Sequence, residues 1–484
     1  MTDTLIVAII GMVAIGVFGF LGRRGPAHGI SEWTVASRKF GGVTTFFLQA
    51  GEVFTTFTFL GLTGLAYAFG APAAYALGYL PLQYLILYFV APKLWTISRD
   101  HNYVGQPDFL AGQYRSKVLG FVAAVMGFAF LLPYLQLQIT GLGLTVQLAT
   151  GQNGSATLSM AIGTVLVVAF VMWAGIRGVA MTAYLKDVLM VVMLAVAAIA
   201  IFVHFTGGLG RVFDQVSEKA PAMLGLQPGS HDVTWFITNL GISVIGAGFA
   251  AFPYTWPGIL GAKSARVIQR NFIIQPIYAL CVIVPISIGF VGILALDKSS
   301  AGNGNGVLLS LAKEAMPGWL LGLLVVAGIA TAMVPSGALL VAMSSMFARN
   351  IALVRKEKQQ FWVGQVMVAV TALIALLLAI KGSNALANLA LLTFSGLAQL
   401  VPSIVAALRR SGPIVHSWSA LAGLVAGVAV VIVLTFSSLK AGTWNVGVIG
   451  LAANIVVVGI VEGALRASRG APQAPPSVRA ESAA

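Results

Sequence analysis

The chain has 484 residues, of which 58% are hydrophobic and only 9% are charged, whereas soluble domains carry about 25% charged residues. This composition predicts an all-α polytopic membrane protein that is embedded in the lipid bilayer. The net charge of +14 is scattered over short loops, so no nucleic-acid partner is expected. One cysteine and five dispersed histidines provide no metal cluster or catalytic centre, so the chain is not expected to be an enzyme.

Apolar runs long enough to cross a bilayer, about 20 residues each, predict thirteen transmembrane helices. They begin near residues 4, 42, 73, 118, 156, 179, 233, 272, 318, 360, 383, 416 and 444. When alternate loops are assigned to opposite sides, 21 of the 28 basic residues fall on one side and 6 on the other, and Lys186 lies within a span. The positive-inside rule then places the amino terminus outside and the carboxyl tail in the cytoplasm, as expected for a multi-pass protein of the plasma (inner) membrane.

Two spans contain residues that do not suit a continuous lipid-facing helix. The second carries Gly51, Glu52 and three threonines in mid-span, and the seventh, at 242–260, carries Pro253 and Pro257. Polar groups at membrane depth need internal partners, so we expect both helices to break beside a cavity. Freed carbonyls at such a break bind cations, and a helix amino end attracts anions. A Gly- and Thr-rich packing face is the alternative for the second span.

Lys186 and Asp187 are adjacent within a span that is otherwise almost wholly apolar. A charge near mid-bilayer costs a few kcal/mol, so an ionisable pair at this depth indicates a site for ions, protons or substrate. The alternative is that Lys186 extends its long side chain to the cytoplasmic membrane surface.

Three local sequences resemble motifs of the sodium/solute symporter family: SEWTVASRKFGG at 31–42, GIRGVA at 175–180 followed by Lys186-Asp187, and GAKSAR at 261–266. The resemblance implies a broken-helix symporter fold with a 5+5 inverted-repeat core. The first repeat (spans 2–6) would occupy 42–206 and the second (spans 7–11) 207–410. The remaining segments would be the first span with its cytoplasmic loop (1–41), spans 12–13 (411–466) and a proline-rich, disordered cytoplasmic tail (467–484).

The resemblance also implies a sodium site between backbone carbonyls of the second span and hydroxyls of the ninth. The corresponding positions are Gly51, Phe54, Thr331, Val334 and Pro335. The family usually has Ser-Thr where this chain has Val334-Pro335, and Ser336 is one residue away from that position. It also usually has Thr-Asp at Lys186-Asp187.

These departures lead to the hypothesis that the Lys186 ammonium replaces the sodium ion. A desolvated lysine can lose its proton, so the coupling ion would be H⁺, with Na⁺ as the alternative. No cofactor is expected, and no metal other than Na⁺.

Six residues are expected to bind substrate by analogy with the family, each with an interhelical hydrogen bond as its alternative role. They are Thr55, Thr56, Thr58, Gln83, Tyr134 and Gln138. The predicted cavity has phenylalanines and no arginine, which favours a small anionic or zwitterionic solute, most of all a short monocarboxylate such as lactate, pyruvate, acetate or propionate. The string at 333–338 also resembles family members that take up monocarboxylates.

The chain is therefore predicted to be a secondary active transporter that works by alternating access. A sodium-coupled proline- or alanine-type symporter or a pantothenate symporter is the alternative, and a membrane-embedded solute sensor is the competing class. Glu52 would pair with Lys186, relay protons or line the cytoplasmic path.

Overall fold

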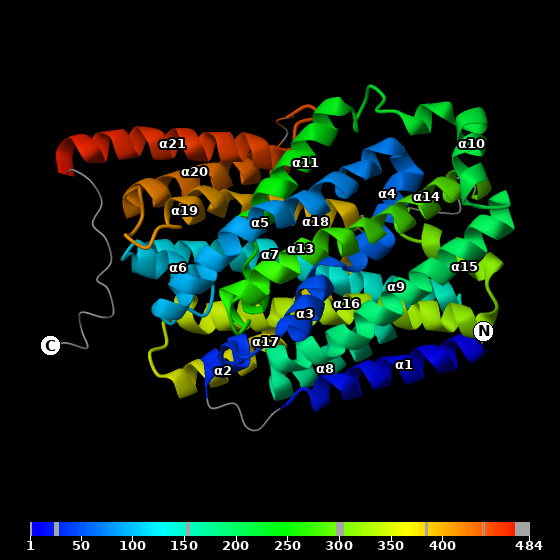
Figure 1. Cartoon of the computed structure of the whole chain (residues 1–484), viewed down its shortest axis with the longest axis horizontal. Helices are drawn as coiled ribbons and strands as arrows, with labels where there is room; N and C mark the ends of the chain where they lie inside the picture. Colours follow the sequence, from blue (N-terminus) through cyan, green and yellow to red (C-terminus); the bar gives the residue numbers. More distant parts are fainter. Residues whose placement is uncertain are drawn as a thin grey trace.

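The computed structural model describes residues 2–23, 29–151, 155–296, 304–382, 386–437, 439 and 441–469. Within these ranges the chain forms helices and no β-strand. The axes of the long helices are roughly aligned with one another, and the helices lie side by side in one bundle (Figure 1). The predicted tail at 467–484 lies almost wholly outside the described residues.

The first part of the chain contains these elements: α1 (Thr2–Leu21), α2 (Ile30–Val35), η1 (Ala36–Arg38), α3 (Gly42–Val53), η2 (Phe57–Gly61), α4 (Leu62–Phe69), η3 (Ala71–Ala74), α5 (Tyr75–Asp100), α6 (Gln106–Gln113), α7 (Lys117–Thr150), α8 (Ser155–Ala174) and α9 (Ile176–Thr206). The second part contains α10 (Leu209–Lys219), η4 (Pro221–Leu224), α11 (Val233–Gly248), η5 (Pro253–Thr255), α12 (Trp256–Leu260), α13 (Ala265–Ala279), η6 (Leu280–Val282), α14 (Ile283–Ala295), α15 (Val307–Ala315), α16 (Gly318–Met346), η7 (Phe347–Ile351), α17 (Glu357–Lys381), α18 (Leu386–Leu397), η8 (Ala398–Leu400), α19 (Val401–Ala406), α20 (Ser417–Phe436) and α21 (Val446–Arg469).

The number of membrane spans is close to the prediction. Eleven helices of the described chain are long and apolar enough to cross a bilayer, and the bent pair of α3 with η2–α4 makes a twelfth. The apolar part of α1, Ile6–Leu21, is shorter and is the remaining candidate for the thirteenth. The largest difference in a starting point is in the eighth span, which was expected near 272 and begins with α13 at Ala265. The predicted all-α polytopic fold is confirmed.

Helix α16 is the centre of the bundle. Its most apolar window is 100% buried inside the protein, and α1, α7 and α9 pack against it. Small residues allow these backbones to approach closely. At Gly328 of α16, for example, an added Cβ would lie 2.8 Å from Cγ2 of Thr145 on α7. This burial places residues 331–336 of α16 in the core, away from lipid.

The second span is broken between α3 and η2, where the two halves meet at an angle of 52°. The backbone amides at the break are satisfied by side chains. The amide of Thr55 donates to Oγ1 of Thr58 at 2.8 Å, and the amide of Thr56 donates to Oε1 of Gln138 at 3.1 Å. The amide of Phe57 donates to Oγ1 of Thr55 at 3.2 Å. Two of the threonines that predicted this break from the sequence, Thr55 and Thr58, therefore also stabilise it.

The seventh span is also broken, between α11 and η5–α12. Ala250 adopts a positive φ of 53° at the break, and Pro253 has no amide hydrogen with which to continue a helix. Gln106 at the start of α6 donates its side-chain amide to the carbonyls of Ala250 (3.1 Å) and Ala251 (2.8 Å). The indole of Trp256 donates to the carbonyl of Ala250 at 2.8 Å. Both predicted interruptions are therefore present.

We expect Gln106→Leu to lower the stability of the protein by about 1–3 kcal/mol, because it removes the side-chain donor to the buried carbonyl of Ala251 and one of the two donors to that of Ala250. The melting temperature of the purified protein in detergent measures this loss. The matched control is Thr371→Val, since the buried Thr371 hydroxyl has no hydrogen-bond partner within the described chain. The control should leave the melting temperature unchanged or raise it. Equal losses in both variants would show that Gln106 does not stabilise the break.

Candidate functional site

The Lys186 side chain is fully buried and points toward the break in the second span. Its Nζ donates to Oδ1 of Asp187 at 2.8 Å and to the backbone carbonyl of Gly51 at 3.4 Å. Nζ also lies 6.0 Å from the centre of the Phe54 ring, within the range of a weak cation–π contact. The relative exposure of Lys186 is 0%. The alternative in which Lys186 reaches the membrane surface is therefore wrong.

Asp187 compensates the charge of Lys186 and connects α9 to α13. Its Oδ1 accepts a second hydrogen bond from the Tyr278 hydroxyl at 3.1 Å. Its Oδ2 is buried and has no hydrogen-bond partner in the part of the chain that is described. The ammonium and carboxylate thus form an ion pair with one acceptor oxygen to spare, beside the broken helix.

Gly51 is the point at which α3, α9 and α16 meet. A Cβ added there would lie 3.1 Å from Cβ of Ala183, 3.3 Å from Cγ1 of Val334 and 3.7 Å from Oδ2 of Asp187. Contacts this short leave little room for any side chain. The absence of a side chain at Gly51 therefore allows α3 to pack closely against α9 and α16, with the Gly51 carbonyl 3.4 Å from Nζ of Lys186.

The other α16 residues predicted for the cation site are buried but bond within their own helix. Oγ1 of Thr331 donates to the carbonyl of Ala327, and Oγ of Ser336 donates to the carbonyl of Ala332, each at 2.7 Å. Pro335 has no amide hydrogen, so it cannot provide the helical hydrogen bond to the carbonyl of Thr331. Of the ninth-span positions, Val334 is the one that the structure places against Gly51, and its side chain has no oxygen.

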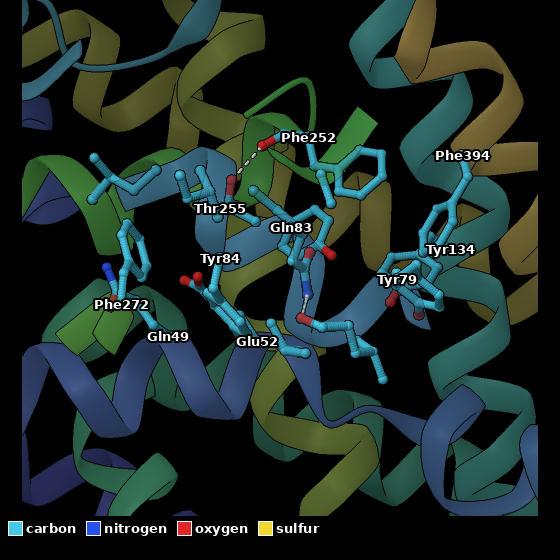
Figure 2. A pocket seen from close by; sticks show the side chains of 16 residues that line it. Gln49, Glu52, Tyr79, Gln83, Tyr84, Tyr134, Phe252, Thr255, Phe272 and Phe394 are labelled. Carbon is cyan, nitrogen blue, oxygen red and sulfur yellow. Dashed lines mark hydrogen bonds between the residues drawn. The ribbon is translucent and has the colours of Figure 1, made fainter. Parts of the chain in front are cut away.

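A small cavity lies between the two broken helices. Its volume is about 40 Å³, enough for about three water molecules. Figure 2 shows the side chains around it, which come from α3, α5, α7, α13, α18 and the segment around η5. Its lining consists of Gln49, Glu52, Val53, Tyr79, Leu80, Gln83, Tyr84, Leu87, Tyr134, Ala247, Phe252, Tyr254, Thr255, Ile259, Phe272 and Phe394.

The six predicted substrate residues divide into two groups. Gln83 and Tyr134 line the cavity, whereas Thr55, Thr56, Thr58 and Gln138 do not. Those four instead hydrogen-bond at the break, where Oγ1 of Thr55 also lies 3.5 Å from the Tyr134 hydroxyl. The helix amino end predicted to attract an anion is therefore already bonded to protein groups in this conformation.

Glu52 faces the cavity and not the ion pair. Its relative exposure is 1%, and its Oε1 has no hydrogen-bond partner among the described residues. An ion pair between Glu52 and Lys186, one of its three expected roles, is not formed, because Lys186 bonds Asp187.

Sequence reasoning missed a polar stripe on α13 that holds α3 in place. Asn271 donates to the carbonyl of Gly42 at 3.1 Å, and Gln275 donates to the carbonyl of Phe46 at 3.0 Å. Tyr278 completes the stripe with its bond to Asp187. These three residues are spaced at i, i+4 and i+7, so they share one helix face. That spacing in an apolar span was the signal that would have identified them.

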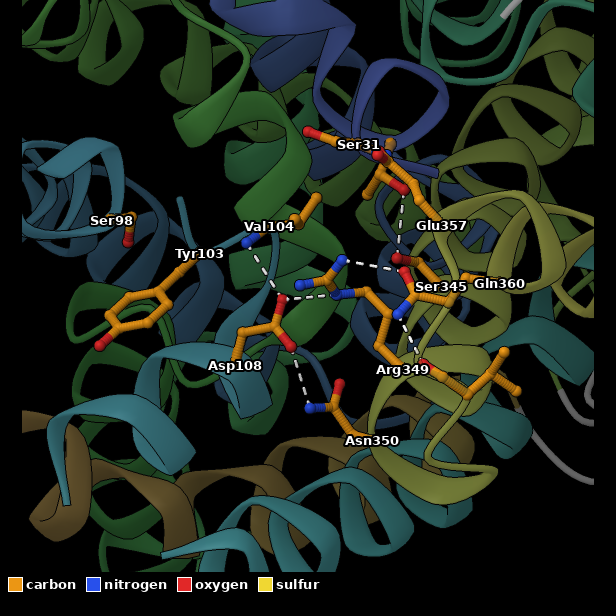
Figure 3. Close-up of polar contacts among 12 residues, drawn as sticks. Ser31, Ser98, Tyr103, Val104, Asp108, Ser345, Arg349, Asn350, Glu357 and Gln360 are labelled. Carbon is orange, nitrogen blue, oxygen red and sulfur yellow. Dashed lines mark hydrogen bonds and ion pairs between the residues drawn. The ribbon is translucent and has the colours of Figure 1, made fainter. Parts of the chain in front are cut away.

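A polar network lies at the end of the bundle that carries α2 and α6, the end predicted to be cytoplasmic (Figure 3). Nε of Arg349 donates to Oδ2 of Asp108 at 2.9 Å, and the Asn350 side chain donates to Oδ1 of Asp108 at 3.0 Å. Arg349 also donates to Gln360 at 3.2 Å. The network therefore connects η7, which follows α16, to α6 and to α17.

Arg38 makes a second connection at the same end. Its guanidinium donates to the carbonyls of Ser98 (3.1 Å), Tyr103 (2.7 Å) and Leu260 (3.2 Å). Burial, together with the nearby Arg99, lowers the pKa of Arg38 to about 10. Arg38 therefore stays protonated at neutral pH and joins the loop after α2 to α5 and α12.

Comparison with known proteins places this geometry in a family. The model of the sodium:solute symporter family matches residues 33–411. The chain is 32% identical over 472 residues to the uncharacterized symporter YhjB of Bacillus subtilis, covering 94% of this chain and 96% of that protein. It is 30% identical over 355 residues to a monocarboxylate transport permease of Rhizobium johnstonii, covering 72% and 70%.

Among solved structures, a Na⁺-coupled sialic acid symporter in a substrate-bound, outward-open state has the same fold. The TM-score is 0.82 at 16% identity, over 98% of this chain and 99% of that one. The chain is thus a multi-pass membrane protein whose family and fold are those of cation-coupled solute transporters and not of enzymes. It belongs to the sodium:solute symporter family.

Proposed function

We propose that this protein imports a short monocarboxylate by alternating access, driven by protons, with the Lys186 ammonium in the place of a coupling sodium ion. The observation that carries this proposal is the fully buried Nζ of Lys186, bonded to the Gly51 carbonyl and to Asp187. The proposal also includes an inner-membrane location with the amino terminus outside.

The cation position explains why protons are proposed over sodium. Sodium needs several oxygen ligands, and two positions where the family usually supplies hydroxyls are Val334 and Pro335 here, which supply none. The same place contains an ammonium with the charge of one sodium ion. Loss and gain of a proton at Lys186 would therefore correspond to release and binding of sodium, with Asp187 stabilising the charged form.

The cavity supports a small acid as the substrate. Its volume of about 40 Å³ and its aromatic lining leave no room for a sugar in this conformation. A relative that covers 72% of this chain is a monocarboxylate transport permease. Sodium/proline and sodium/pantothenate symporters of Escherichia coli are more distant, at 23% identity each, so their substrates are the alternatives to test.

The defining test is uptake of radiolabelled lactate, pyruvate, acetate and propionate into proteoliposomes under imposed gradients. We expect a proton gradient to drive accumulation, a protonophore to abolish it and sodium to have no effect. Lys186→Ala should reduce uptake to background, because it removes the ammonium that takes the place of the coupling ion. Lys219→Ala, on the exposed surface of α10, is the control and should behave as wild type.

Accumulation that requires sodium and saturates with it would contradict proton coupling. Uptake of proline or pantothenate, and of none of the four acids, would show that the substrate is not a short monocarboxylate. Solute binding without accumulation would favour the competing class, a membrane-embedded solute sensor.

A gain of sodium dependence is expected when the family pattern is restored. Lys186→Thr combined with Val334→Ser and Pro335→Thr removes the ammonium and restores hydroxyls at the positions where the family usually has them, so sodium should stimulate uptake by this variant. The single variant Lys186→Thr should be inactive both with and without sodium. Failure of the triple variant to respond to sodium, while it remains folded, would show that Lys186 does not occupy an ion position.

The network around Arg349 is expected to keep the cytoplasmic end closed. Arg349→Gln should increase labelling of Ala342→Cys, in a Cys281→Ser background, about tenfold or more, since charge-assisted hydrogen bonds are worth about 1.5–3 kcal/mol. An impermeant maleimide applied to each side of membrane vesicles measures the rate. Arg355→Gln, at an exposed position between η7 and α17, should leave labelling unchanged. Faster labelling from the external side would contradict the predicted orientation.

A further inference from the structure

The central cavity contains three polar side chains whose hydrogen bonds are unfilled. Both amide atoms of Gln49, Oε1 of Glu52 and the Tyr84 hydroxyl have no partner among the residues that the structure describes. Their relative exposures are 4%, 1% and 2%, and all three line the same cavity (Figure 2). Buried polar groups in native proteins are nearly always hydrogen-bonded, so three unfilled groups around one cavity indicate a polar ligand.

We propose that Gln49, Glu52 and Tyr84 bind the carboxylate of the transported acid, and that Glu52 does so as the neutral carboxylic acid. This inference rests on the proposed function, because it takes the substrate to be a short monocarboxylate. It assigns the substrate carboxylate to the cavity and not to the helix break, where the backbone amides of Thr55, Thr56 and Phe57 already donate to protein side chains.

The backbone arrangement directs these groups toward one another. Gln49 and Glu52 are three residues apart on α3, so they lie on one helix face. The Glu52 carboxyl packs against Gly258 of α12, where an added Cβ would lie 2.9 Å from its Oε2. Tyr84 lines the cavity from α5, with its ring 5.7 Å from that of Phe272. Two donors and one carboxylic acid therefore face the space that a carboxylate would occupy.

No cation is available to an ionised Glu52 within the described bundle. Lys186 is engaged by Asp187 and by the Gly51 carbonyl. The titratable groups that line the cavity with Glu52 are tyrosines: Tyr79 and Tyr84 of α5, Tyr134 of α7 and Tyr254 of η5. Tyr278 of α13 and Lys186 both bond Asp187 and not Glu52. An ionised carboxylate in this setting would be desolvated and unpaired.

The substrate brings a second carboxylate into the same small space. Two carboxyl groups that share a site hold one proton between them, because their like charges repel. Glu52 would therefore take up a proton before the anion binds and donate it in a hydrogen bond to the substrate carboxylate. The acid and the proton then leave together on the other side, and no covalent bond to carbon changes. Substrate binding itself would thus require a proton, separately from Lys186.

Glu52→Gln tests this role, because glutamine keeps the shape and a donor but cannot exchange a proton. In proteoliposomes with radiolabelled lactate, pyruvate, acetate or propionate, the wild-type KM should rise by about tenfold per pH unit above the pH at which Glu52 loses its proton. In Glu52→Gln the KM should stay flat with pH, while a proton gradient still drives accumulation through Lys186. Gln49→Leu and Tyr84→Phe should raise KM about tenfold or more at every pH.

The control is Glu218→Gln, at an exposed position on α10, which should keep the wild-type KM profile. The same pH-dependent rise in Glu52→Gln would overturn the role of Glu52, as would loss of binding in this variant while its melting temperature is unchanged. Uptake of none of the four acids by the wild-type protein would instead overturn the proposed function. The two failures are therefore distinguishable.

Discussion

The structure depends on the compensation of one buried charge. Lys186 is fully buried and its nearest acceptor is the neighbouring residue, Asp187, at 2.8 Å. An isolated ammonium in this position would be strongly destabilising. Because the carboxylate is adjacent in the sequence, the pair is brought into the membrane core by a single helix. The ammonium of Lys186 can then donate to the Gly51 carbonyl without any ion from solution.

Breaks in two helices at membrane depth persist because other elements supply their missing hydrogen bonds. Gln138 from α7 serves the first break, and Gln106 from α6 serves the second. The stripe on α13 adds donors to carbonyls of α3. Irregular backbone inside a bilayer is tolerated only where it is enclosed by protein in this way. The same side chains therefore define which segments can line a cavity and which must remain continuous helices.

The sequence predicted what local physics determines and missed what tertiary contacts determine. Hydropathy located the spans. The breaks were located by Gly51 and the threonines in the second span and by Pro253 and Pro257 in the seventh, because these residues disturb the helix in which they lie. Nothing local distinguishes Thr55, whose hydroxyl bonds an amide at the break, from Tyr84, whose hydroxyl faces the cavity unpaired. That difference arises only when α3 and α5 pack together. The partner of Lys186 was an exception, because it is a sequence neighbour.

The two ionisable sites of the core differ in a way that bears on transport. Lys186 has a carboxylate partner that stays with it in the closed protein, so its charged form is stable without a ligand. Among the described residues Oε1 of Glu52 has no partner, and Glu52 lies beside unfilled polar groups. Under the proposal above, its stable form depends on what enters the cavity. A symporter must not change conformation when only the solute or only the coupling ion is bound, and it must change conformation when both are bound. Under the proposed function, Lys186 maintains the packing beside the broken helix while it is charged and weakens that packing when it loses its proton, whereas Glu52 responds to the solute that enters the cavity.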